Sequence, residues 1–470
     1  MVRYLTTTLP YVNADPHVGF AVELIQADAL ARSWRIQGDD VYFSTGTDEH
    51  GQKIFEAAQK NGQEAQAYVD HYANEVMKLK ETLDLSNDGF IRTTDAVHIH
   101  AAQEMWRRCS AKGDIYKKSY SGLYCVGCEA YKTEKDIEDE HCPLHPSLSL
   151  ETLTEENYFF KFSNYTEQLL RYLSNPESIL PDWRREEALN FVKGGLEDFS
   201  ISREKARLSW GVPVPEDDSQ VMYVWFDALT GYLSTLGWPE AEDKFNKYWK
   251  EGHTIQVAGK DQVRFQSLMW QAMLLSADLP HTDQVFYHGF INSGGQRMSK
   301  SLGNVISPYE LVQKYGTDAT RFMLLRHVHP VEDSDVTWEK FDEWYTADLV
   351  NGLGNVVARV MKLAETYLDS PVSPEQSPKD TITLETFEFN TALDTIWARI
   401  GLIDERITNE EPFKVVKEDA ERGKRIIAEL AGEVYIIGSL LQAFMPKTSA
   451  LITAAVLENK KPENLFPRLP

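Results

Sequence analysis

Cysteine is scarce in this chain, which has 4 cysteines among 470 residues. So few cysteines cannot form the dense disulfide framework of a small secreted protein. Long apolar runs are also lacking, because the most apolar late stretch, 426–445, is interrupted by acidic residues and glycines. The first residues do not form the apolar core of a signal peptide. We therefore predict a cytoplasmic protein with no membrane-spanning segment and no membrane partner.

Positive charge is in deficit as well. The chain has 48 Lys and Arg against 72 Asp and Glu, a formal net charge of −24. Such a chain is repelled by anionic lipid, and it binds nucleic acid only where cations gather locally. Apolar residues make 42% of the chain and charged residues 26%, which is a globular profile. The length, about three typical domains, predicts a multidomain protein.

Apolar patterning predicts an α/β fold with a doubly wound parallel sheet. Residues 2–8 are apolar and β-branched, residues 17–35 follow a helical pattern, and residues 41–45 form a second apolar run. Strand, crossover helix and strand in this order are typical of a parallel sheet, in which ligands bind beyond the carboxyl ends of the strands. The loops at 9–19 and 46–51 would lie there. Further strands are expected at 221–226, 254–258 and 285–288.

Two regions do not follow the sheet pattern. Residues 116–210 have short apolar runs, many turns and three clustered cysteines, which indicates a small insertion. From about residue 343 onward the apolar residues recur at alternating steps of four and three, the spacing of one helix face. A C-terminal helical bundle is therefore expected, with helices over 349–367, 391–408, 419–444 and 448–458.

The insertion carries a metal-binding pattern. Cys125 and Cys128 form one pair, and Cys142 and His145 form a second pair after 13 intervening residues. Each pair suits a tight knuckle, and three thiolates with one imidazole complete a tetrahedral Zn²⁺ shell. Because all four positions are protein ligands, we predict one structural zinc per chain. The remaining cysteine, Cys109, lies in a helical stretch and is expected to be an inert, partly buried thiol.

Two tracts suggest phosphate binding, although both common phosphate loops, GxxxxGK[ST] and GxGxxG, are absent. His17 and Gly19 stand at the opening of the first helix, where free N–H groups attract an anion and a glycine lets a flat base approach. The second tract is 294–304, with glycines on both sides of Arg297 and Lys300. Two cations and two hydroxyls within five residues can close over a triphosphate and stabilise a pyrophosphate leaving group.

These tracts, in this order, resemble those of the class I aminoacyl-tRNA synthetases, and among them the methionyl-tRNA synthetases. The resemblance covers essentially the whole chain. It includes the HIGH site at 17–20, the segment 45–51, the single zinc knuckle, the segment 224–228 and the KMSKS site at 297–301. It implies a Rossmann-like catalytic domain that joins methionine to the α-phosphate of ATP and then charges the terminal adenosine of tRNA(Met), the initiator included.

The resemblance also implies roles for individual residues. Asp48 would anchor the substrate ammonium. The side-chain pocket and its aromatic shell would be Leu9, Tyr11, Trp225, Tyr232, Phe265, Gln266 and Trp270. ATP would be bound by His17, Gly19, Gly259, Asp261 and Lys300, with His17, Arg297 and Lys300 as the catalytic groups and Mg²⁺ accompanying the nucleotide. The anticodon would be read by Asn355, Arg359 and Phe413.

Four positions depart from the family pattern. Phe20 stands where the HIGH motif ends in a second histidine, and Arg297 replaces the first lysine of KMSKS. Gln266 stands where a histidine near the substrate sulfur is usual, and Phe413 replaces a tryptophan. Phe20 cannot donate a hydrogen bond to the triphosphate, and a lost transition-state donor commonly costs roughly 10²–10³ in rate. The alternative reading is therefore a catalytically degenerate paralogue that binds tRNA or regulates.

The expected domain division follows the motifs. It comprises a catalytic domain in two halves, 1–115 and 221–290, a connective insertion, 116–220, with the knuckle at 121–150, a stem-contact segment, 291–345, and an anticodon-binding bundle, 346–470. The insertion is too short for the editing domain of the isoleucine, leucine and valine enzymes. Because the chain ends soon after the last helix, a monomer is expected.

Overall fold

The computed structural model describes residues 1–128, 130–132, 136–298, 303–373 and 382–469. The chain forms two compact units, and each is described by itself. The first unit comprises Met1–Pro16, Asp40–Lys78 and Asn87–His288. The second unit comprises His17–Asp39, Leu79–Ser86 and Gly289–Pro470.

A six-stranded sheet with every neighbouring pair parallel lies at the centre of the first unit, which confirms the predicted fold class. Its order is β3-β2-β1-β11-β12-β7. The strands are β1 (Val2–Thr6), β2 (Asp40–Thr47), β3 (Gly89–Arg92), β7 (Ile179–Leu180), β11 (His253–Gly259) and β12 (Gln284–His288). The strand order reverses between β1 and β11, so the crevice beyond their carboxyl ends is where such sheets bind ligands.

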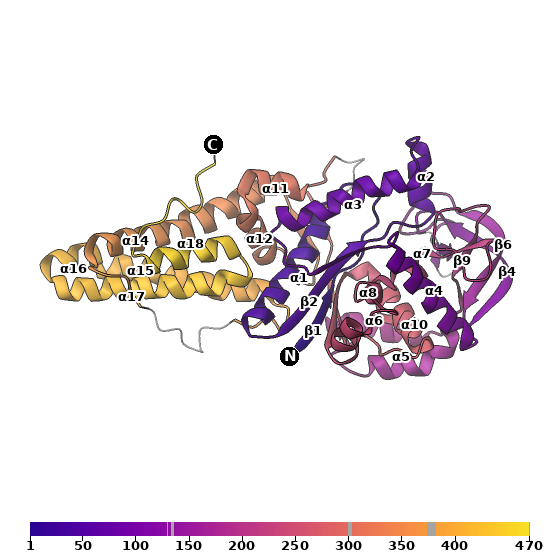
Figure 1. Cartoon of the computed structure of the whole chain (residues 1–470). Helices are drawn as coiled ribbons and strands as arrows, with labels where there is room; N and C mark the ends of the chain where they lie inside the picture. Colours follow the sequence, from indigo (N-terminus) through magenta and orange to yellow (C-terminus); the bar gives the residue numbers. More distant parts are fainter. Residues whose placement is uncertain (129, 133–135, 299–302, 374–381, 470) are drawn as a thin grey trace. The chain divides into compact units, whose positions relative to one another are not determined.

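Helices pack around this sheet, and Figure 1 labels most of them. The helix α4 (Ala96–Ala111) packs against α7 (Val224–Ala228), α8 (Gly231–Ser234) and α10 (Trp270–Ser276). The large buried side chains of this core include Trp106, Phe226, Trp270 and Tyr287. The other helices and helical turns are α2 (Gln52–Lys60), α3 (Ala65–Thr82), η2 (Phe162–Tyr165), α5 (Thr166–Leu173), α6 (Asp182–Lys193), α9 (Glu242–Phe245), η3 (Asn246–Lys250), η4 (Lys260–Gln262) and η5 (Phe265–Met269).

The expected strand at 221–226 is wrong as a strand of the main sheet. Only β10 (Gln220–Met222) is extended, and it pairs antiparallel with β9 (Ser202–Glu204). The chain then turns at Tyr223 into the helix α7. A short apolar run has the same composition in a buried strand and in a buried helix, so periodicity alone could not separate them.

The predicted insertion contains a four-stranded antiparallel sheet in the order β5-β4-β6-β8. Its strands are β4 (Ile115–Cys125), β5 (Ala130–Lys132), β6 (Glu151–Phe160) and β8 (Phe199–Ser200), and Figure 1 shows β4 and β6 side by side. Between β6 and β8 the chain returns to the main sheet, because β7 pairs parallel with β12. Part of the segment predicted as an insertion therefore completes the edge of the central sheet.

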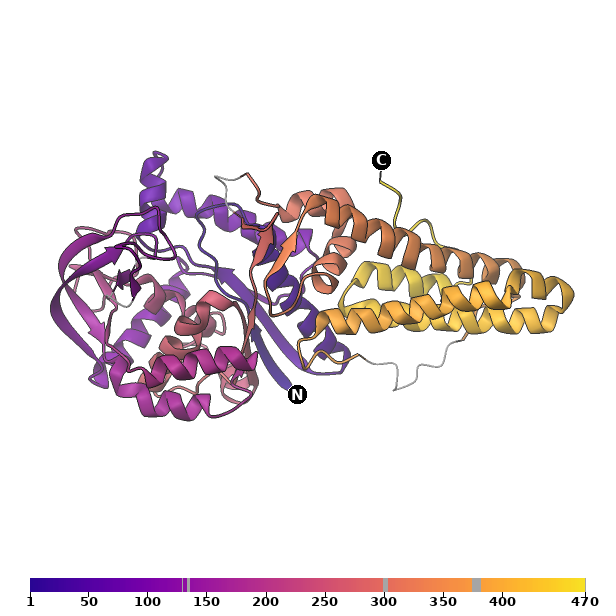
Figure 2. The same ribbon diagram turned by 180° about the vertical axis from the view of Figure 1, so that it is seen from behind.

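The second unit is mostly helical, which confirms the predicted C-terminal bundle (Figures 1 and 2). The first helix of the chain, α1 (Val18–Ile36), belongs to it and packs against α12 (Thr317–Arg326). A small sheet in the order β14-β13-β15 is formed by β13 (Ile291–Ser293), β14 (Gln296–Arg297) and β15 (Ser334–Val336). The remaining helices are α11 (Pro308–Tyr315), α13 (Trp338–Trp344), η7 (Tyr345–Gly354), α14 (Asn355–Tyr367), α15 (Phe389–Glu410), α16 (Pro412–Glu418), α17 (Ala420–Leu440), η8 (Leu441–Ala443) and α18 (Pro446–Leu457).

One helix of the bundle is apolar enough to cross a membrane by length and composition alone. It spans Ala420–Ala443, and its most apolar window of 18 residues has a mean hydropathy of 1.4 and is 50% buried. Its buried residues, such as Ile427, Leu430 and Val434, lie in α17, which packs against α14, α16 and α18. These contacts are typical of the core helix of a bundle.

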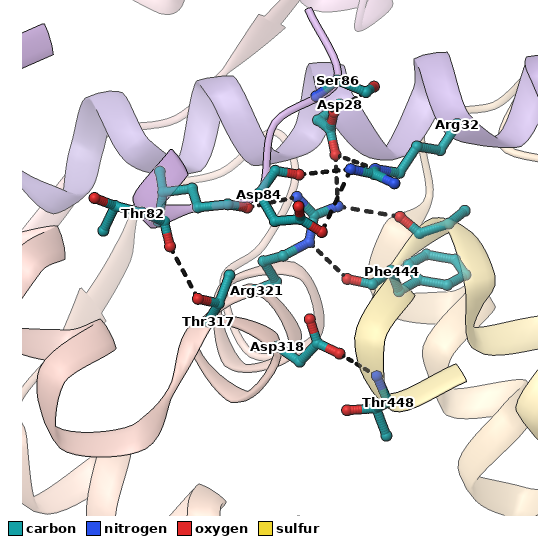
Figure 3. A network of polar contacts seen from close by, with 12 residues as sticks. Asp28, Arg32, Thr82, Asp84, Ser86, Thr317, Asp318, Arg321, Phe444 and Thr448 are labelled. Atoms are coloured by element: carbon teal, nitrogen blue, oxygen red, sulfur yellow. Dashed lines mark hydrogen bonds and ion pairs between the residues drawn. The ribbon is translucent and has the colours of Figure 1, made fainter. Parts of the chain in front are cut away.

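A buried ion pair joins distant segments of the second unit (Figure 3). Arg321 on α12 has no exposed side-chain surface, and one guanidinium nitrogen lies 2.8 Å from a carboxylate oxygen of Asp28 on α1. Its other N–H groups donate to the backbone carbonyls of Leu83, Ala443 and Phe444, at 2.8–3.1 Å. Arg321 therefore ties α1 and the end of α3 to the segment that follows α17.

Candidate active site

The loop after β1 and the end of β2 lie together in the first unit. Tyr11 pairs with Asp48 in a parallel bridge. The amide of Val12 donates to the carbonyl of Asp48 at 3.2 Å, and the amide of Asp48 donates to the carbonyl of Pro10 at 3.0 Å. The expected ammonium anchor, Asp48, is therefore buried directly beside the Tyr11 segment.

Aromatic rings form a wall next to this pair. The rings of Trp225 and Phe265 stack with their centroids 3.9 Å apart and their planes 12° apart. Tyr11 meets Trp225 edge-on, with the centroids 6.2 Å apart. Leu9 packs against Gly231, where an added Cβ would lie 2.5 Å from a Leu9 methyl carbon. The loop after β1, α7 and η5, which are remote in sequence, therefore supply one apolar surface beside Asp48.

Three further residues of the expected pocket lie together, Tyr232, Trp270 and Gln266. Tyr232 and Trp270 meet edge-on with centroids 5.9 Å apart, and all three side chains are buried. The Gln266 side-chain amide donates to the Tyr232 hydroxyl at 2.6 Å. The structure thus brings together all eight residues that the resemblance assigned to this pocket.

The end of β11 supplies the positions expected to bind ribose. Gly259 is the last residue of the strand, and Asp261 follows in the turn η4. A Cβ added at Gly259 would lie 2.8 Å from a carboxylate oxygen of Asp261. The Asp261 carboxylate therefore lies against the Gly259 backbone at the strand end, which is the carboxyl edge of the sheet.

In the second unit, His17 caps the first helix. Its Nδ1 accepts from the amide of Gly19 at 3.0 Å, and an added Cβ on Gly19 would lie 2.8 Å from the ring. The surrounding protein and the Arg297 guanidinium hold the pKa of His17 below its ordinary value, so the imidazole is neutral at pH 7. Phe20, the departure from the HIGH motif, follows within the first turn.

The first amides of this helix are all occupied, which differs from the free anion site expected there. Val18 donates to the carbonyl of Ile306 at 3.0 Å, and Gly19 donates to the His17 ring. Phe20 and Ala21 both donate to the carbonyl of His17. A phosphate at this end must therefore be contacted by side chains, or must displace the His17 ring from Gly19.

The second phosphate tract lies partly outside the described residues. Arg297 is exposed on β14, and its guanidinium stands 4.3 Å from the centre of the Phe290 ring. Asn304 donates to the carbonyls of Ser293 and Arg297 at 3.3 Å, which holds the base of the loop. Lys300 lies outside the described residues.

The four predicted metal ligands meet at one point of the first unit. The ligand atoms of Cys125, Cys128, Cys142 and His145 all lie within 4.8 Å of one another. The Cys128 and Cys142 sulfurs are 3.4 Å apart, close to the separation of about 3.7 Å that two Zn–S bonds of 2.3 Å give in a tetrahedron. An added Cβ on Gly127 would lie 2.5 Å from the His145 ring, so the knuckle requires glycine there. The donor set and its size fit a zinc ion.

The fourth cysteine behaves as the sequence predicts. Cys109 is fully buried on α4, and burial raises the pKa of its thiol to about 12. Such a thiol carries almost no thiolate at neutral pH and is inert.

The expected anticodon residues lie on two helices of the bundle. Asn355 begins α14, and Arg359 follows one turn later, where it forms an ion pair with Asp404 on α15. Phe413 lies on the short helix α16, with 39% of its surface exposed. Both α14 and α16 pack against α17. One guanidinium nitrogen of Arg359 is therefore held by a carboxylate.

Sequence reasoning missed a second set of polar side chains near the ring wall. His50, His98 and Asp227 form a buried hydrogen-bonded chain, and none of them was assigned a role. His50 and Asp227 stand inside the quoted segments 45–51 and 224–228. Their presence in the same segments as Asp48 and Trp225 was the available signal.

The chain is similar to known proteins over most of its length. The model of the family described as tRNA synthetases class I (M) matches residues 3–148 and 149–361. A methionine--tRNA ligase of Caldanaerobacter subterraneus subsp. tengcongensis is 39% identical over 465 residues, covering 95% of this chain and 72% of that protein. One of Brucella suis is 38% identical, covering 95% of this chain and 90% of its own length.

A solved structure is similar over nearly the whole chain. The Mycobacterium tuberculosis methionyl-tRNA synthetase in complex with methionyl-adenylate has a TM-score of 0.88 and 36% identity. The match covers 99% of this chain and 98% of that one.

Proposed function

Because this chain belongs to the tRNA synthetases class I (M), we propose that it is a methionine--tRNA ligase. It joins methionine to AMP with release of pyrophosphate, and it then transfers the methionyl group to the 3′-terminal adenosine of tRNA(Met), the initiator included. The observation that carries the proposal is the backbone bridge that places Asp48, at the end of β2, beside Tyr11, whose ring contacts that of Trp225. The non-catalytic alternative finds no support among these relatives.

The pocket suits a zwitterion with a thioether side chain. The Asp48 carboxylate supplies the counter-charge for the α-ammonium. The rings of Trp225 and Phe265 hold a flexible, polarizable sulfur chain, because sulfur–aromatic contacts are favourable. Leucine offers these rings no polarizable sulfur, so its contacts with them would be weaker.

We infer that ATP is bound by the residues that the motifs assign to it. His17, neutral at pH 7, offers a ring N–H to a phosphate oxygen, and Gly19 has no side chain to collide with the His17 ring. Gly259 and Asp261 receive the ribose at the end of β11. Arg297, together with Lys300, would neutralise the charge that develops on the leaving pyrophosphate. Mg²⁺ would accompany ATP as part of the substrate complex.

Zinc would be held by the three thiolates and the imidazole of the knuckle. It would supply the folding energy of this small segment, which otherwise has few apolar residues to bury. The chemistry of methionine activation proceeds without any step at this ion, because all four ligand positions belong to the protein.

The bundle would read the anticodon. Phe413 offers a flat, half-exposed ring on which a base can stack, and stacking contributes about 1–3 kcal/mol per base. Asn355 would bond a base edge, and Arg359 would do so after leaving Asp404.

We infer the domain division given by the motifs, a monomeric state and a cytoplasmic location. Gel filtration and cell fractionation test the last two.

ATP–pyrophosphate exchange tests the proposal. Exchange is expected with methionine, weaker exchange with norleucine, and none with leucine. Asp48→Asn should raise the KM for methionine about 100-fold or more, because a charge-assisted contact is lost. The matched control is Asp278→Asn, which removes an exposed carboxylate paired with Lys112 and should leave exchange unchanged. Absence of exchange with every amino acid would support the non-catalytic alternative instead.

A further inference from the structure

A chain of buried hydrogen bonds crosses the first unit beside the ring wall. One carboxylate oxygen of Asp227 lies 2.9 Å from Nδ1 of His50, and the other lies 3.0 Å from Nε2 of His98. The second nitrogen of His98 lies 3.1 Å from the hydroxyl of Ser234. The Asp227 and His98 side chains have no exposed surface, and His50 retains 5%. This chain lies outside the residues assigned above to substrate.

The donors in the chain can be assigned. A carboxylate only accepts, so His50 carries hydrogen on Nδ1 and His98 carries hydrogen on Nε2. The hydroxyl of Ser234, which lies 3.1 Å from Nδ1 of His98, also donates to the carbonyl of Gly231 at 3.3 Å. Burial alone would raise the pKa of Asp227, yet the two imidazoles hold that pKa below its usual value. Both oxygens of the buried Asp227 carboxylate have a histidine partner, and losing either partner would leave its charge without a hydrogen bond. We call the three residues His50, Asp227 and His98 the junction.

One end of the junction holds the ammonium anchor. His50 follows Asp48 by two residues, and the intervening Glu49 carbonyl accepts from the indole nitrogen of Trp210 at 2.6 Å. The Trp210 ring also packs edge-on against His50, with centroids 5.5 Å apart. Asp48 is in turn bridged to Tyr11 through the backbone. Contacts that hold His50 in place therefore also restrict the backbone of Asp48 and, through the bridge, the Tyr11 segment.

The other end holds the ring wall. Asp227 follows Trp225 by two residues on the short helix α7. The buried indole nitrogen of Trp225 has no hydrogen-bond partner among the described residues. The ring is therefore placed by its contacts with Phe265 and Tyr11 and by the position of α7 itself. Asp227 sets that position, because His98 binds it to α4.

We propose that Asp227 is a positioning residue for methionine binding, which holds the Asp48 anchor and the Trp225 ring at one fixed separation through His50 and His98. The inference rests on the proposed function. A substrate that must touch both groups binds only when their separation matches it, and a misplacement of about 1 Å can cost 10²-fold. Asp227 is not among the residues assigned to ATP, so its loss should weaken methionine binding and leave ATP binding unchanged.

The test is Asp227→Asn, which keeps the shape and replaces one acceptor by an N–H₂ that faces an imidazole. The KM for methionine in ATP–pyrophosphate exchange should rise about 10-fold or more, with kcat and the KM for ATP changed less than about twofold. Norleucine, which uses the same anchor and wall, should show the same factor. Calorimetric titration of methionine without ATP should show the same loss of affinity.

A second variant covers the case in which Asp227→Asn does not fold. His50→Gln keeps a side-chain donor near the carboxylate and should give a smaller rise in the methionine KM, in the same direction. The matched control is Asp283→Asn, another aspartate with a histidine neighbour, which binds Thr254 and His253 at the opposite end of β11. The control should lower the melting temperature and leave the methionine KM unchanged.

The outcomes separate the inference from the proposed function. An unchanged methionine KM in folded Asp227→Asn, or in His50→Gln if the first variant is unfolded, overturns the inference. An equal rise in the KM for ATP also overturns it, because a general loosening would then explain both. If the unaltered chain exchanges no pyrophosphate with methionine, the proposed function itself fails.

Discussion

The first turn of α1 shows how much chemistry rests on single residues. His17 turns its ring onto the amide of Gly19, and any side chain at position 19 would collide with that ring. Burial lowers the pKa of His17, and the nearby guanidinium of Arg297 lowers it further. The result is a neutral imidazole, poised over a glycine, at the start of the helix.

Phe20→His should maintain or raise the rate of methionine adenylation. Phe20 lies in the first helical turn beside His17, and a histidine there adds a donor for the triphosphate. Pyrophosphate-exchange rates at saturating substrates measure the effect. A folded variant without activity would show that position 20 does not face the nucleotide as assigned.

The geometry of the zinc knuckle depends on Gly127 and on the backbone bridge between two of its ligands. Gly127 stands between the first two cysteines, where the His145 ring packs against its backbone. Cys142 and His145 are joined by an isolated bridge, which turns the second pair of ligands toward the first. Backbone geometry therefore brings the four side chains together.

Gly127→Ala should weaken metal binding. The added methyl would lie 2.5 Å from the His145 ring, so this ligand must shift. A perturbed ligand orientation typically lowers metal affinity by roughly 10–100-fold. Plasma emission spectroscopy should find one zinc per chain in the unaltered protein and less than one in the variant after dialysis against a weak chelator. Gly401→Ala on α15, where an added Cβ meets no atom within 4 Å, is the control for handling losses. Folded, unaltered protein without zinc would contradict the site.

The Asp28–Arg321 pair links elements of the second unit in the same way (Figure 3). Asp28 also binds Arg32 at 2.7 Å and the amide and hydroxyl of Ser86. Burial opposes its charge, but these partners hold the pKa of Asp28 below its ordinary value. The carboxylate thus stabilises the packing of α1 against α12.

Asp28→Asn should destabilise the protein by about 3–5 kcal/mol, because Arg321 would be left buried without its counter-charge. Since the folded pKa of Asp28 is lowered, its contribution is present above the unfolded pKa of about 4 and is lost as pH falls through the folded pKa. Thermal melts should show a wide gap between variant and unaltered protein at pH 7. That gap should narrow below about pH 4.

Asp369→Asn is the matched control for this pair. Asp369 binds Lys424 with 87% of its side chain exposed, and a surface pair of this kind contributes about 0–1 kcal/mol. A melting temperature that falls as much in the control as in Asp28→Asn would show that burial of the pair is not the cause.

At the scale of the whole molecule, the net charge of −24 opposes a nucleic-acid partner. The cation assigned to the anticodon, Arg359, is itself paired with Asp404. We therefore expect recognition of tRNA to depend on a few local contacts and on base stacking at Phe413, with little contribution from general attraction to phosphate.

Binding of tRNA(Met) should weaken with salt, but along a shallow slope. If about three phosphates are neutralised, log K should fall with log salt at a slope near −2 to −3. Filter binding between 50 and 200 mM salt measures it. Arg359→Gln should lower affinity at every salt concentration, whereas Lys362→Gln, which removes an exposed lysine on the same helix, should change it little. A slope near −6 would reveal a cationic surface that these residues do not explain.

Much of the candidate site was predictable from the sequence because its chemistry is local. Two ligand pairs spaced by two residues fix the knuckle, and both pairs meet in the structure. Residues within the motif segments, such as Asp48 and Trp225, were assigned to one pocket, and Tyr11 links them, because its backbone pairs with Asp48 and its ring contacts Trp225. The helical bundle followed from apolar spacing, which needs only contacts within a few turns.

Other features needed the tertiary structure, because their causes lie far apart in the chain. The run at 221–226 divides into β10 and α7, since its pairing partner, β9, is some twenty residues earlier. Ile306 occupies the first amide of α1, so the helix end is not the free anion site that its residues suggest.

The sequence by itself determined the residue types at the site, the metal ligands and the class of reaction, because each depends on side-chain chemistry at short spacing. Only the tertiary structure decided how those residues are held. The junction of His50, Asp227 and His98 joins positions 50, 98 and 227. A buried charge is stable only when distant partners meet it, and no local pattern records which partners they are.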